Sequence, residues 1–315
     1  MSSRWQYTKG LHDLGAGVFA YLQPDGSWGW SNAGLITDGE HSLLVDTLFD
    51  LELTRTMLDE MGSASRAAQD IDCVVNTHAN GDHCWGNQLV AGAEIVASKA
   101  CAEEMAEVPP QMLAAMMKAA PTMGELGAYL VRIFGDFEFE DIALTTPSRT
   151  FEGELGLTVG AKEVRLIEVG PAHTRGDILV HVPADGVVFS GDILFIEGHP
   201  IIWAGPIGNW IRACERILEM APEIVVPGHG PITDVAGVAE VKGYLRYIEA
   251  AARQRFEAGL SAQEAARDIA LDDYSSWGDG ERIVVNVHTL YREFEGDLGA
   301  PDIPHLFAEM AKFAR

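Results

Sequence analysis

The sequence predicts an α/β fold built as one domain, and three features of the chain support this prediction. Short apolar runs typical of buried strands alternate with stretches of helical periodicity. Several of these runs end in glycine-containing turns that carry a histidine or an aspartate. The 315 residues suffice for one large core, and no linker, repeat or low-complexity tract divides them. We therefore expect a single domain over residues 1–315.

The N-terminal part is expected to form strands and one helix. The turn Pro24-Asp25-Gly26 separates the first two strands, and the apolar periodicity of 51–62 predicts the helix. The expected strands lie at 17–22, 33–37, 42–46 and 73–76.

The loop after the last of these strands carries the densest group of metal-binding side chains. Its sequence is Thr77-His78-Ala79-Asn80-Gly81-Asp82-His83. His78 and His83 offer neutral imidazole nitrogens and Asp82 offers a hard oxygen, and Zn²⁺ accepts both kinds of ligand at about 2.0 to 2.2 Å. The loop therefore predicts a metal site.

Three later turns each add one histidine or aspartate after an apolar run. They are 170–174 with His173, 190–192 with Asp192, and 227–230 with His229. We expect these side chains to lie at strand ends, because a rigid scaffold can hold functional groups there.

With these turns the chain resembles the metallo-β-lactamase superfamily, whose signature is HxHxDH followed in order by a histidine, an aspartate and a histidine. The resemblance covers about residues 15–232. It implies a four-layer αββα sandwich whose ligands lie at the edge where its two sheets meet. It also implies two metal sites bridged by Asp192. The first would hold His78, Asn80 and His173, and the second Asp82, His83 and His229.

Asn80 stands where the family signature has its second histidine. An amide oxygen is a weaker ligand for Zn²⁺ than an imidazole. Losing a histidine ligand should cost at least the roughly 10- to 100-fold in affinity that is typical of losing a residue that supports a ligand. We therefore expect the first site to fill less readily than the second.

The second half is expected to repeat the strand pattern and to carry a helical insert. Strands are expected at 164–167, 178–182 and 187–190. The stretch 102–140 holds five of the ten methionines at helical spacing with other apolar residues. Such a stripe is typical of a core-facing helix. A substrate lid carrying Met116 and Met117, or a homodimer surface, is the alternative, because methionine-rich faces accept varied apolar partners.

The stretch 235–315 is expected to be helical. Ser261 and Glu264 predict a capping box, and 281–295 predicts a helix that ends near Gly296. A further helix is expected to begin near Asn209.

Aromatic and polar residues near the ligand turns are candidates for substrate binding. The two tryptophans after the first turn either cover the substrate as a flap or pack against the strands. The other three follow Asp192 and either line a pocket or dock the next helix. The candidates are Trp28, Trp30, His199, Trp203 and Asn209.

The composition limits the partners of the chain. Lys and Arg number 22 against 47 Asp and Glu, so the net charge is −25, which repels nucleic acid and anionic lipid. No apolar stretch reaches the ~18 residues of a membrane span, and residues 1–7 lack the apolar region of a secretory signal. We expect a cytoplasmic protein that acts on a small molecule, either as a monomer or as a homodimer.

Several other polar residues are expected to be structural. Asp46 is expected to support the ligand loop, because metal-bound imidazoles need partners on their other nitrogen. Cys84 directly follows a ligand, so an approach to the metal is an alternative to core packing. The four cysteines, without a CxxC pair, are expected to be reduced thiols: Cys73, Cys84, Cys101 and Cys214. The histidines expected to be structural are His12, His41, His181, His288 and His305.

The resemblance implies hydrolysis. One or two Zn²⁺ ions, with Fe or Mn as alternatives, would lower the pKa of bound water from about 15.7 toward ~7 and polarise the carbonyl of an ester, lactone, thioester or amide. Asp82 is the candidate catalytic residue, because it could both bind the metal and orient the resulting hydroxide. The apolar insert and the tryptophans favour a small apolar or aromatic substrate. The alternatives are a lyase or an iron-dependent oxidation, or ligand binding without turnover.

Overall fold

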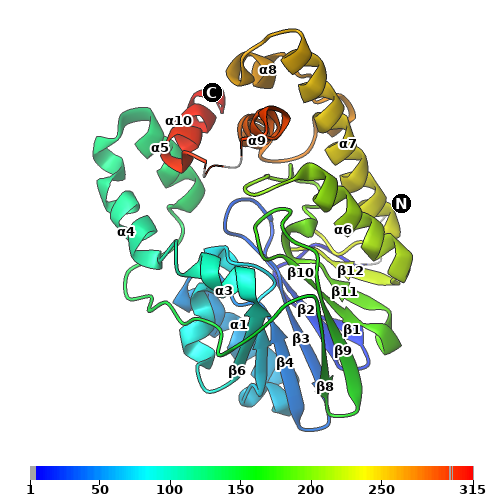
Figure 1. Ribbon diagram of the computed structural model, residues 1–315. Coiled ribbons are helices and arrows are strands. Elements are labelled where there is room, and N and C mark those ends of the chain that lie inside the picture. Colours follow the sequence, from blue (N-terminus) through cyan, green and yellow to red (C-terminus); the bar gives the residue numbers. More distant parts are fainter. Residues whose placement is uncertain (1–4, 298, 300, 315) are drawn as a thin grey trace.

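The computed structural model describes residues 5–297, 299 and 301–314. Residues 1–4 of the predicted domain, and residues 298, 300 and 315 of the predicted C-terminal helical stretch, lie outside the described residues. Two β-sheets lie together, and helices surround them (Figure 1).

In the described part of the chain, the first sheet has seven strands in sequence order from β1 to β7. Strands β1 to β4 pair antiparallel, and β4 to β7 pair parallel. Their bounds are β1 (Gly10–Gly15), β2 (Val18–Leu22), β3 (Ala33–Asp38), β4 (His41–Val45), β5 (Cys73–Val75), β6 (Glu94–Ser98) and β7 (Arg149–Phe151).

The described residues form a second sheet of five strands in the order β12-β11-β10-β9-β8. Strands β8 to β11 pair antiparallel, and β11 pairs parallel with β12. Their bounds are β8 (Glu154–Val159), β9 (Lys162–Glu168), β10 (Ile178–Val182), β11 (Val187–Phe189) and β12 (Ile224–Val226).

Helices cover the outer face of each sheet. The helix α1 (Leu51–Ala64) shares a core cluster with the first sheet, and α6 (Ile207–Met220) and α7 (Val235–Glu257) share one with the second. The remaining helices are α2 (Gly81–Cys84), α3 (Lys99–Met105), α4 (Pro110–Ala119), α5 (Gly124–Phe134), α8 (Ala262–Asp268), α9 (Ile283–Glu295) and α10 (Ile303–Phe313).

Alternating side chains of the strands enter different cores, as the two-residue period of a strand requires. In β10, Val180 and Val182 lie in the cluster between the sheets, whereas Leu179 lies in the cluster with α6 and α7. In β3, Ile36 lies between the sheets and Leu35 lies in the cluster with α1. The structure therefore confirms the predicted four-layer αββα sandwich.

The predicted strands occur with their ends shifted by at most two residues, but five strands were not predicted. Four of these five, β1, β7, β8 and β12, lie at sheet edges. In β1 and β8 exposed residues interrupt the apolar pattern, and β7 and β12 are only three residues long, too short to show a period. The sequence also missed β6, which pairs with the edge strand β7.

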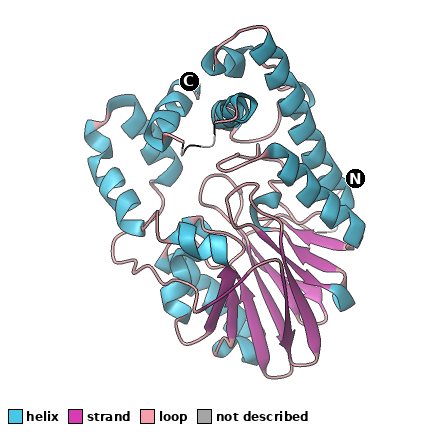
Figure 2. Cartoon of the chain, in the orientation of Figure 1, coloured by secondary structure: helices cyan, strands magenta, loops and turns pink. Residues whose placement is uncertain are grey.

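The predicted insert and C-terminal stretch are helical and lie at one end of the strands (Figure 2). The insert corresponds to α3, α4 and α5, with α3 beginning at Lys99. Phe134 of α5 packs near Phe307 of α10, with ring centroids 6.2 Å apart. The capping box of Ser261 and Glu264 is present. None of the described helices is both long and apolar enough to cross a membrane.

Candidate metal centre

The predicted ligand turns meet at one edge of the two sheets. His78 and His83 follow β5, and His173 lies in the loop between β9 and β10. Asp192 follows β11, and His229 follows β12. These five residues are at most 4 % exposed, so the group is buried.

Asp192 lies at the centre of this group. Its Oδ1 atom is 3.1 Å from Nε2 of His83. Its Oδ2 atom is 3.5 Å from Nε2 of His78, 3.2 Å from Nε2 of His173 and 3.5 Å from Nε2 of His229. One carboxylate therefore faces the same atom of all four histidines.

Asp82 adds a second carboxylate beside His229 and His83. Its Oδ2 atom is 3.2 Å from Nε2 of His229 and 3.9 Å from Nε2 of His83. The ligand atoms of these three residues all lie within 4.8 Å of one another, and they are the predicted second site. A second set with the same spacing joins His78, His83 and Asp192.

Backbone carbonyls fix the protonation of two histidine rings. Nδ1 of His173 lies 2.7 Å from the carbonyl oxygen of Ile201, and Nδ1 of His229 lies 3.0 Å from that of Gly26. A carbonyl oxygen can only accept, so each Nδ1 carries the hydrogen and donates it. The Nε2 atom of the neutral ring then keeps its lone pair, which is the form that binds metal.

Asp46 and Thr77 fix the other two rings in the same way. Nδ1 of His83 donates to Oδ2 of Asp46 at 2.9 Å. The hydroxyl of Thr77 donates to the same carboxylate oxygen at 2.7 Å, so its own oxygen accepts from Nδ1 of His78 at 3.0 Å. The contact confirms the predicted supporting role of Asp46. The part played by Thr77 was not predicted, although its place directly before His78 is a local signal.

This arrangement fits a metal ion. With every Nδ1 protonated, the Nε2 lone pairs face the carboxylate oxygens of Asp192 and Asp82, which is repulsive unless a positive charge lies between them. Within the described structure, Nε2 of His78 and His83 and Oδ1 of Asp192 are buried without a hydrogen-bond partner. Imidazole nitrogens and carboxylate oxygens are also the donor set that Zn²⁺ accepts.

The pKa values show how strongly the group attracts positive charge. Burial by itself lowers the pKa of His229, but the carboxylates of Asp192 and Asp82 outweigh it and raise that pKa to about 9. Burial would raise the pKa of Asp192, but the surrounding histidines hold it well below its usual value. Burial lowers the pKa of His173 to about 3, against the opposing effect of Asp192. The site therefore holds ionised carboxylates that favour a cation.

Asn80 lies beside His173, where the resemblance placed it. Its Oδ1 atom is 3.1 Å from Nε2 of His173, and the residue is half-buried. The amide oxygen thus faces the lone pair of a predicted ligand. A cation shared between the two atoms would stabilise this contact.

Glycines let the ligand turns approach one another. A Cβ atom at Gly228 would clash with Oδ1 of Asp192. Gly191 has a φ of +49°, a left-handed conformation, and a Cβ atom there would also crowd the side chain of Thr77. The glycines before Asp192 and His229 are therefore required by the close approach of these turns.

The two predicted flap tryptophans pack against aromatic rings. Trp28 is 8 % exposed, and its ring centroid lies 6.0 Å from that of Phe134 and 5.8 Å from that of Phe307. The ring centroid of Trp30 lies 4.7 Å from that of Phe137. These partners lie on α5, in the loop after it and on α10 rather than on the strands, and contact with substrate stays a prediction.

The other predicted substrate residues have different surroundings. Trp203 lies beside a ligand, because its backbone N–H donates to the carbonyl of His173 at 3.1 Å. His199 is wholly buried, and its ring centroid lies 5.2 Å from that of Tyr244 and 5.8 Å from that of Trp277. Asn209 accepts a hydrogen bond from Arg212 in the first turn of α6, and its contact with substrate stays a prediction.

Met116 and Met117 lie on α4, half-buried against the largest core cluster. Nearby Met112 is 58 % exposed, so this helix also presents apolar surface to solvent. Whether the two methionines contact substrate or a second copy of the chain stays a prediction.

Cys84 belongs to the core. Its thiol is 1 % exposed and donates to the carbonyl of Asn80 at 3.3 Å. Burial, with a contribution from Asp46, raises its pKa well above the usual value. A neutral, hydrogen-bonded thiol is a poor metal ligand, so the structure supports core packing over an approach to the metal.

Comparison with known protein families gives one match over most of this region. The sequence model of the metallo-beta-lactamase superfamily matches residues 26–229. This span contains all the ligand turns and ends at the ligand His229.

Sequence relatives share low identity with the chain. The acyl-coenzyme A thioesterase MBLAC2 of Bos taurus is 26% identical over 216 residues, which cover 63% of this chain and 72% of that protein. The match to the protein of the same name from Gallus gallus is 28% identical and covers 26% of this chain and only 31% of that protein. The hydroxyacylglutathione hydrolase of Cereibacter sphaeroides is 35% identical over 79 residues, 25% of this chain and 30% of that protein.

Two solved structures show the likeness of the fold. The sec-alkylsulfatase Pisa1 from Pseudomonas sp. aligns with a TM-score of 0.67 and 16% identity, covering 91% of this chain and 50% of that chain. The present chain thus spans half the length of the sulfatase. The metallo-beta-lactamase from Pontibacter korlensis aligns with a TM-score of 0.56 and 19% identity, covering 76% of this chain and 99% of that chain.

Proposed function

Because the chain belongs to the metallo-beta-lactamase superfamily, we propose that it is a metal-dependent hydrolase that cleaves the acyl bond of a small thioester with an apolar or aromatic acyl group. The observation that carries this proposal is the convergence of four Nε2 atoms on the carboxylate of Asp192. Every one of these rings is held in the metal-binding form by a partner at Nδ1.

The residues that would hold the metal fall into two groups. Asp82, His83 and His229 form the complete set, and His78, Asn80 and His173 form the set weakened by the amide, with Asp192 shared. A divalent metal held there would supply a Lewis acid that lowers the pKa of water and polarises an acyl carbonyl. We expect one or two Zn²⁺ ions, with Fe or Mn as alternatives.

Asp82 is the proposed catalytic residue of the chain itself. Burial would raise its pKa, but His83 and His229 outweigh burial and lower it. The carboxylate is therefore ionised at neutral pH and can accept a proton from an attacking water. Its side chain is 13 % exposed, against 4 % for Asp192. Asp82 is thus the more open of the two carboxylates.

Two observations support an apolar thioester over the other acyl bonds. The bovine relative is named an acyl-coenzyme A thioesterase, and the bacterial relative is named a hydrolase of hydroxyacylglutathione. Beside the ligands, Trp203 contacts the backbone of His173, and its ring centroid lies 6.0 Å from that of Phe307. An aromatic neighbourhood of this kind favours an apolar acyl group.

A substrate panel with defined metals tests the proposal. The metal-free protein is loaded with Zn²⁺, Mn²⁺ or Fe²⁺ and offered acetyl-, octanoyl- and benzoyl-coenzyme A, the matched ethyl esters, a γ-lactone and a β-lactam. We expect metal-dependent release of free thiol, faster for octanoyl and benzoyl than for acetyl. If the protein binds these compounds but no metal supports turnover, it is a binding protein. Oxygen consumption with the Fe²⁺ form would instead indicate an oxidation.

A further inference from the structure

Arg282 is an almost fully buried arginine outside the stretch that matches the family. It ends a short turn, Gly280–Arg282, directly before α9, and it is 2 % exposed. Its Nη1 donates to the carbonyl of His199 at 2.9 Å, and its Nη2 pairs with Oδ2 of Asp279 at 3.0 Å. Burying a guanidinium costs free energy even when it is paired. The contacts of Arg282 therefore indicate why it lies there.

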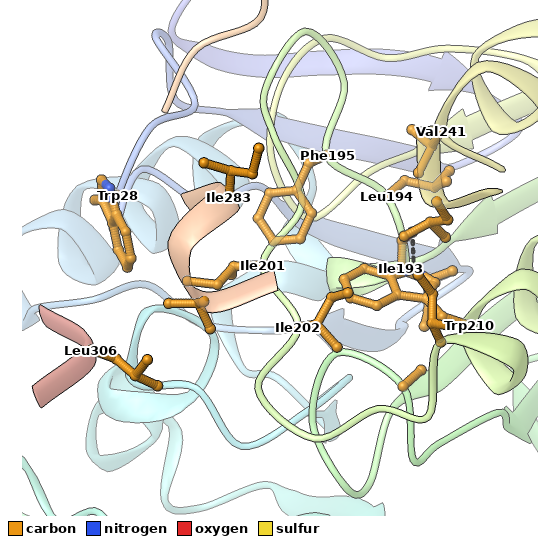
Figure 3. Packing of buried hydrophobic residues seen from close by; sticks show 14 of the residues in the cluster. Trp28, Ile193, Leu194, Phe195, Ile201, Ile202, Trp210, Val241, Ile283 and Leu306 are labelled. Carbon is orange, nitrogen blue, oxygen red and sulfur yellow. Dashed lines mark hydrogen bonds between the residues drawn. The ribbon is translucent and has the colours of Figure 1, made fainter. Parts of the chain in front are cut away.

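The guanidinium lies between two aromatic rings. Its Cζ atom is 4.5 Å from the ring centroid of Trp28 and 5.1 Å from that of Phe195. Figure 3 shows these two rings on opposite sides of Ile283, the residue that follows Arg282 in the chain. Contacts of this kind are stronger when the cation is removed from water.

Phe195 connects this arginine to a metal ligand. Its ring is nearly parallel to that of His229, with an interplanar angle of 4° and centroids 5.1 Å apart. Arg282, Phe195 and His229 are therefore linked by successive ring contacts. Arg282 packs against the Phe195 ring and restricts its orientation. Phe195 in turn covers one face of the His229 ring.

A second route leads from the same arginine to the same ligand. Asp279, which pairs with Arg282, accepts a hydrogen bond from the hydroxyl of Ser27 at 2.6 Å. Ser27 lies between Trp28 and Gly26, whose carbonyl accepts from Nδ1 of His229 at 3.0 Å. His229 thus contacts Phe195, which packs against Arg282, and the carbonyl of Gly26, which precedes a residue bonded to Asp279.

We propose that Arg282 is the positioning residue of the His229 side of the metal centre, so that the helices after residue 229 set the metal affinity of the Asp82, His83 and His229 group. The proposal rests on metal binding at the proposed site and does not depend on the identity of the substrate. Residues that orient a metal-bound histidine change affinity by roughly 10- to 100-fold when they are lost. Phe195 also contacts His173 of the other group, edge-on, with ring centroids 5.5 Å apart at 61°. Among the described residues, only His229 has both the parallel ring contact with Phe195 and the carbonyl contact with Gly26.

Stepwise Co²⁺ titration of the metal-free protein tests this proposal, read from the absorption spectrum of bound Co²⁺ and from calorimetry. Arg282→Met removes the charge and the hydrogen bonds but keeps much of the apolar volume. We expect the step assigned to His229 to weaken by about 10- to 100-fold, and the other step to weaken less, because Phe195 is the one described contact that it shares with this route. A His229→Ala variant assigns the steps. Arg282→Lys should recover part of the loss, since it keeps the charge without the planar fork.

Arg132→Met is the matched control. Arg132 also lies over a ring, with Cζ 5.0 Å from the centroid of Tyr129, and also pairs with a carboxylate, that of Glu281 at 3.2 Å. Its side chain is 53 % exposed, against 2 % for Arg282, and its described ring contact is with Tyr129 rather than with Trp28 or Phe195. This variant should leave both Co²⁺ steps unchanged.

If Arg282→Met does not fold, Ser27→Ala tests the proposal instead. It removes only the hydrogen bond from Ser27 to Asp279, and Ser27 is half-buried. It should weaken the His229 step alone. Equal weakening of both steps, or unchanged steps in a folded Arg282→Met protein, would overturn the proposal. If the wild-type protein hydrolyses none of the panel but the Co²⁺ steps respond as expected, the proposed function fails and the positioning role stands.

Discussion

Nε2 of His173 lies 3.1 Å from Oδ1 of Asn80, and Nδ1 of the same ring donates to the carbonyl of Ile201. The imidazole lone pair and the amide oxygen therefore face each other as two acceptors. A metal ion relieves this repulsion in one way. A rotated amide, whose NH₂ group donates to Nε2, relieves it in another way and leaves the first group without the oxygen ligand of Asn80.

Asn80→His should tighten the weaker metal step. An imidazole binds Zn²⁺ better than an amide oxygen, so we expect the affinity of that step to rise at least about 10-fold and the stoichiometry to approach two. Zn²⁺ calorimetry on the metal-free protein measures the change. Two equally tight steps in the unchanged protein would contradict the idea that Asn80 weakens the first group.

Asp192→Ala and His229→Ala should differ in their effects on metal content. Asp192 faces all four histidines, so its loss should strip both groups, whereas the loss of His229 should affect the group that contains Asp82. Both variants should lose turnover while circular dichroism shows an intact fold. The readout is metal per protein after dialysis. Full metal in either variant would remove that residue from the centre.

The metal-free protein should lose stability as pH rises from 6.5 toward about 9. The folded state raises the pKa of His229 from 6.5 to about 9, because two carboxylates outweigh the effect of burial. The folded chain therefore keeps a proton that the unfolded chain releases, so this stabilisation is complete below about 6.5 and is lost as pH rises through about 9. Its size should be on the order of 1 to 3 kcal/mol.

Urea unfolding of chelator-treated protein across this pH range checks the sign. A His229→Gln variant, which cannot hold the proton, should show a flatter profile. Stability that increases between pH 6.5 and 9 would be inconsistent with the carboxylates being the dominant influence on His229.

Met116→Asp or Met117→Asp should slow the hydrolysis of octanoyl-coenzyme A far more than that of acetyl-coenzyme A if α4 contacts the acyl chain. The reason is that binding energy remote from the reacting carbonyl would be lost while the metal ligands stay unchanged. Comparison of kcat/KM for the two substrates measures this. Equal losses would assign the helix to packing. A shift confined to the monomer–dimer equilibrium, measured by sedimentation, would assign it to association.

Through its resemblance to a known superfamily, the sequence was sufficient to predict the four-layer sandwich and to name the proposed ligands, which the structure brings together. The ligand residues could be found because metal chemistry restricts each position to a few side-chain types, and the glycines beside them follow from the close approach of the turns. The helices α1 and α9 were predicted to within two residues at each end, because burial of one face produces a regular apolar pattern. The edge strands β1 and β8 carry a weaker pattern, because much of each is exposed.

What only the tertiary structure decided is how the ligand rings are held. The partners of His173 and His229 are the backbone carbonyls of Ile201 and Gly26, and a backbone carbonyl is present at every residue whatever its side chain. Such partners leave no mark in the sequence. Arg282 is similar, since its contact with Phe195 joins residues far apart in the chain, and an isolated arginine before a helix looks like any exposed one. The local sequence identifies which side chains can bind a metal, whereas the orientation of those side chains depends on which distant segments pack beside them.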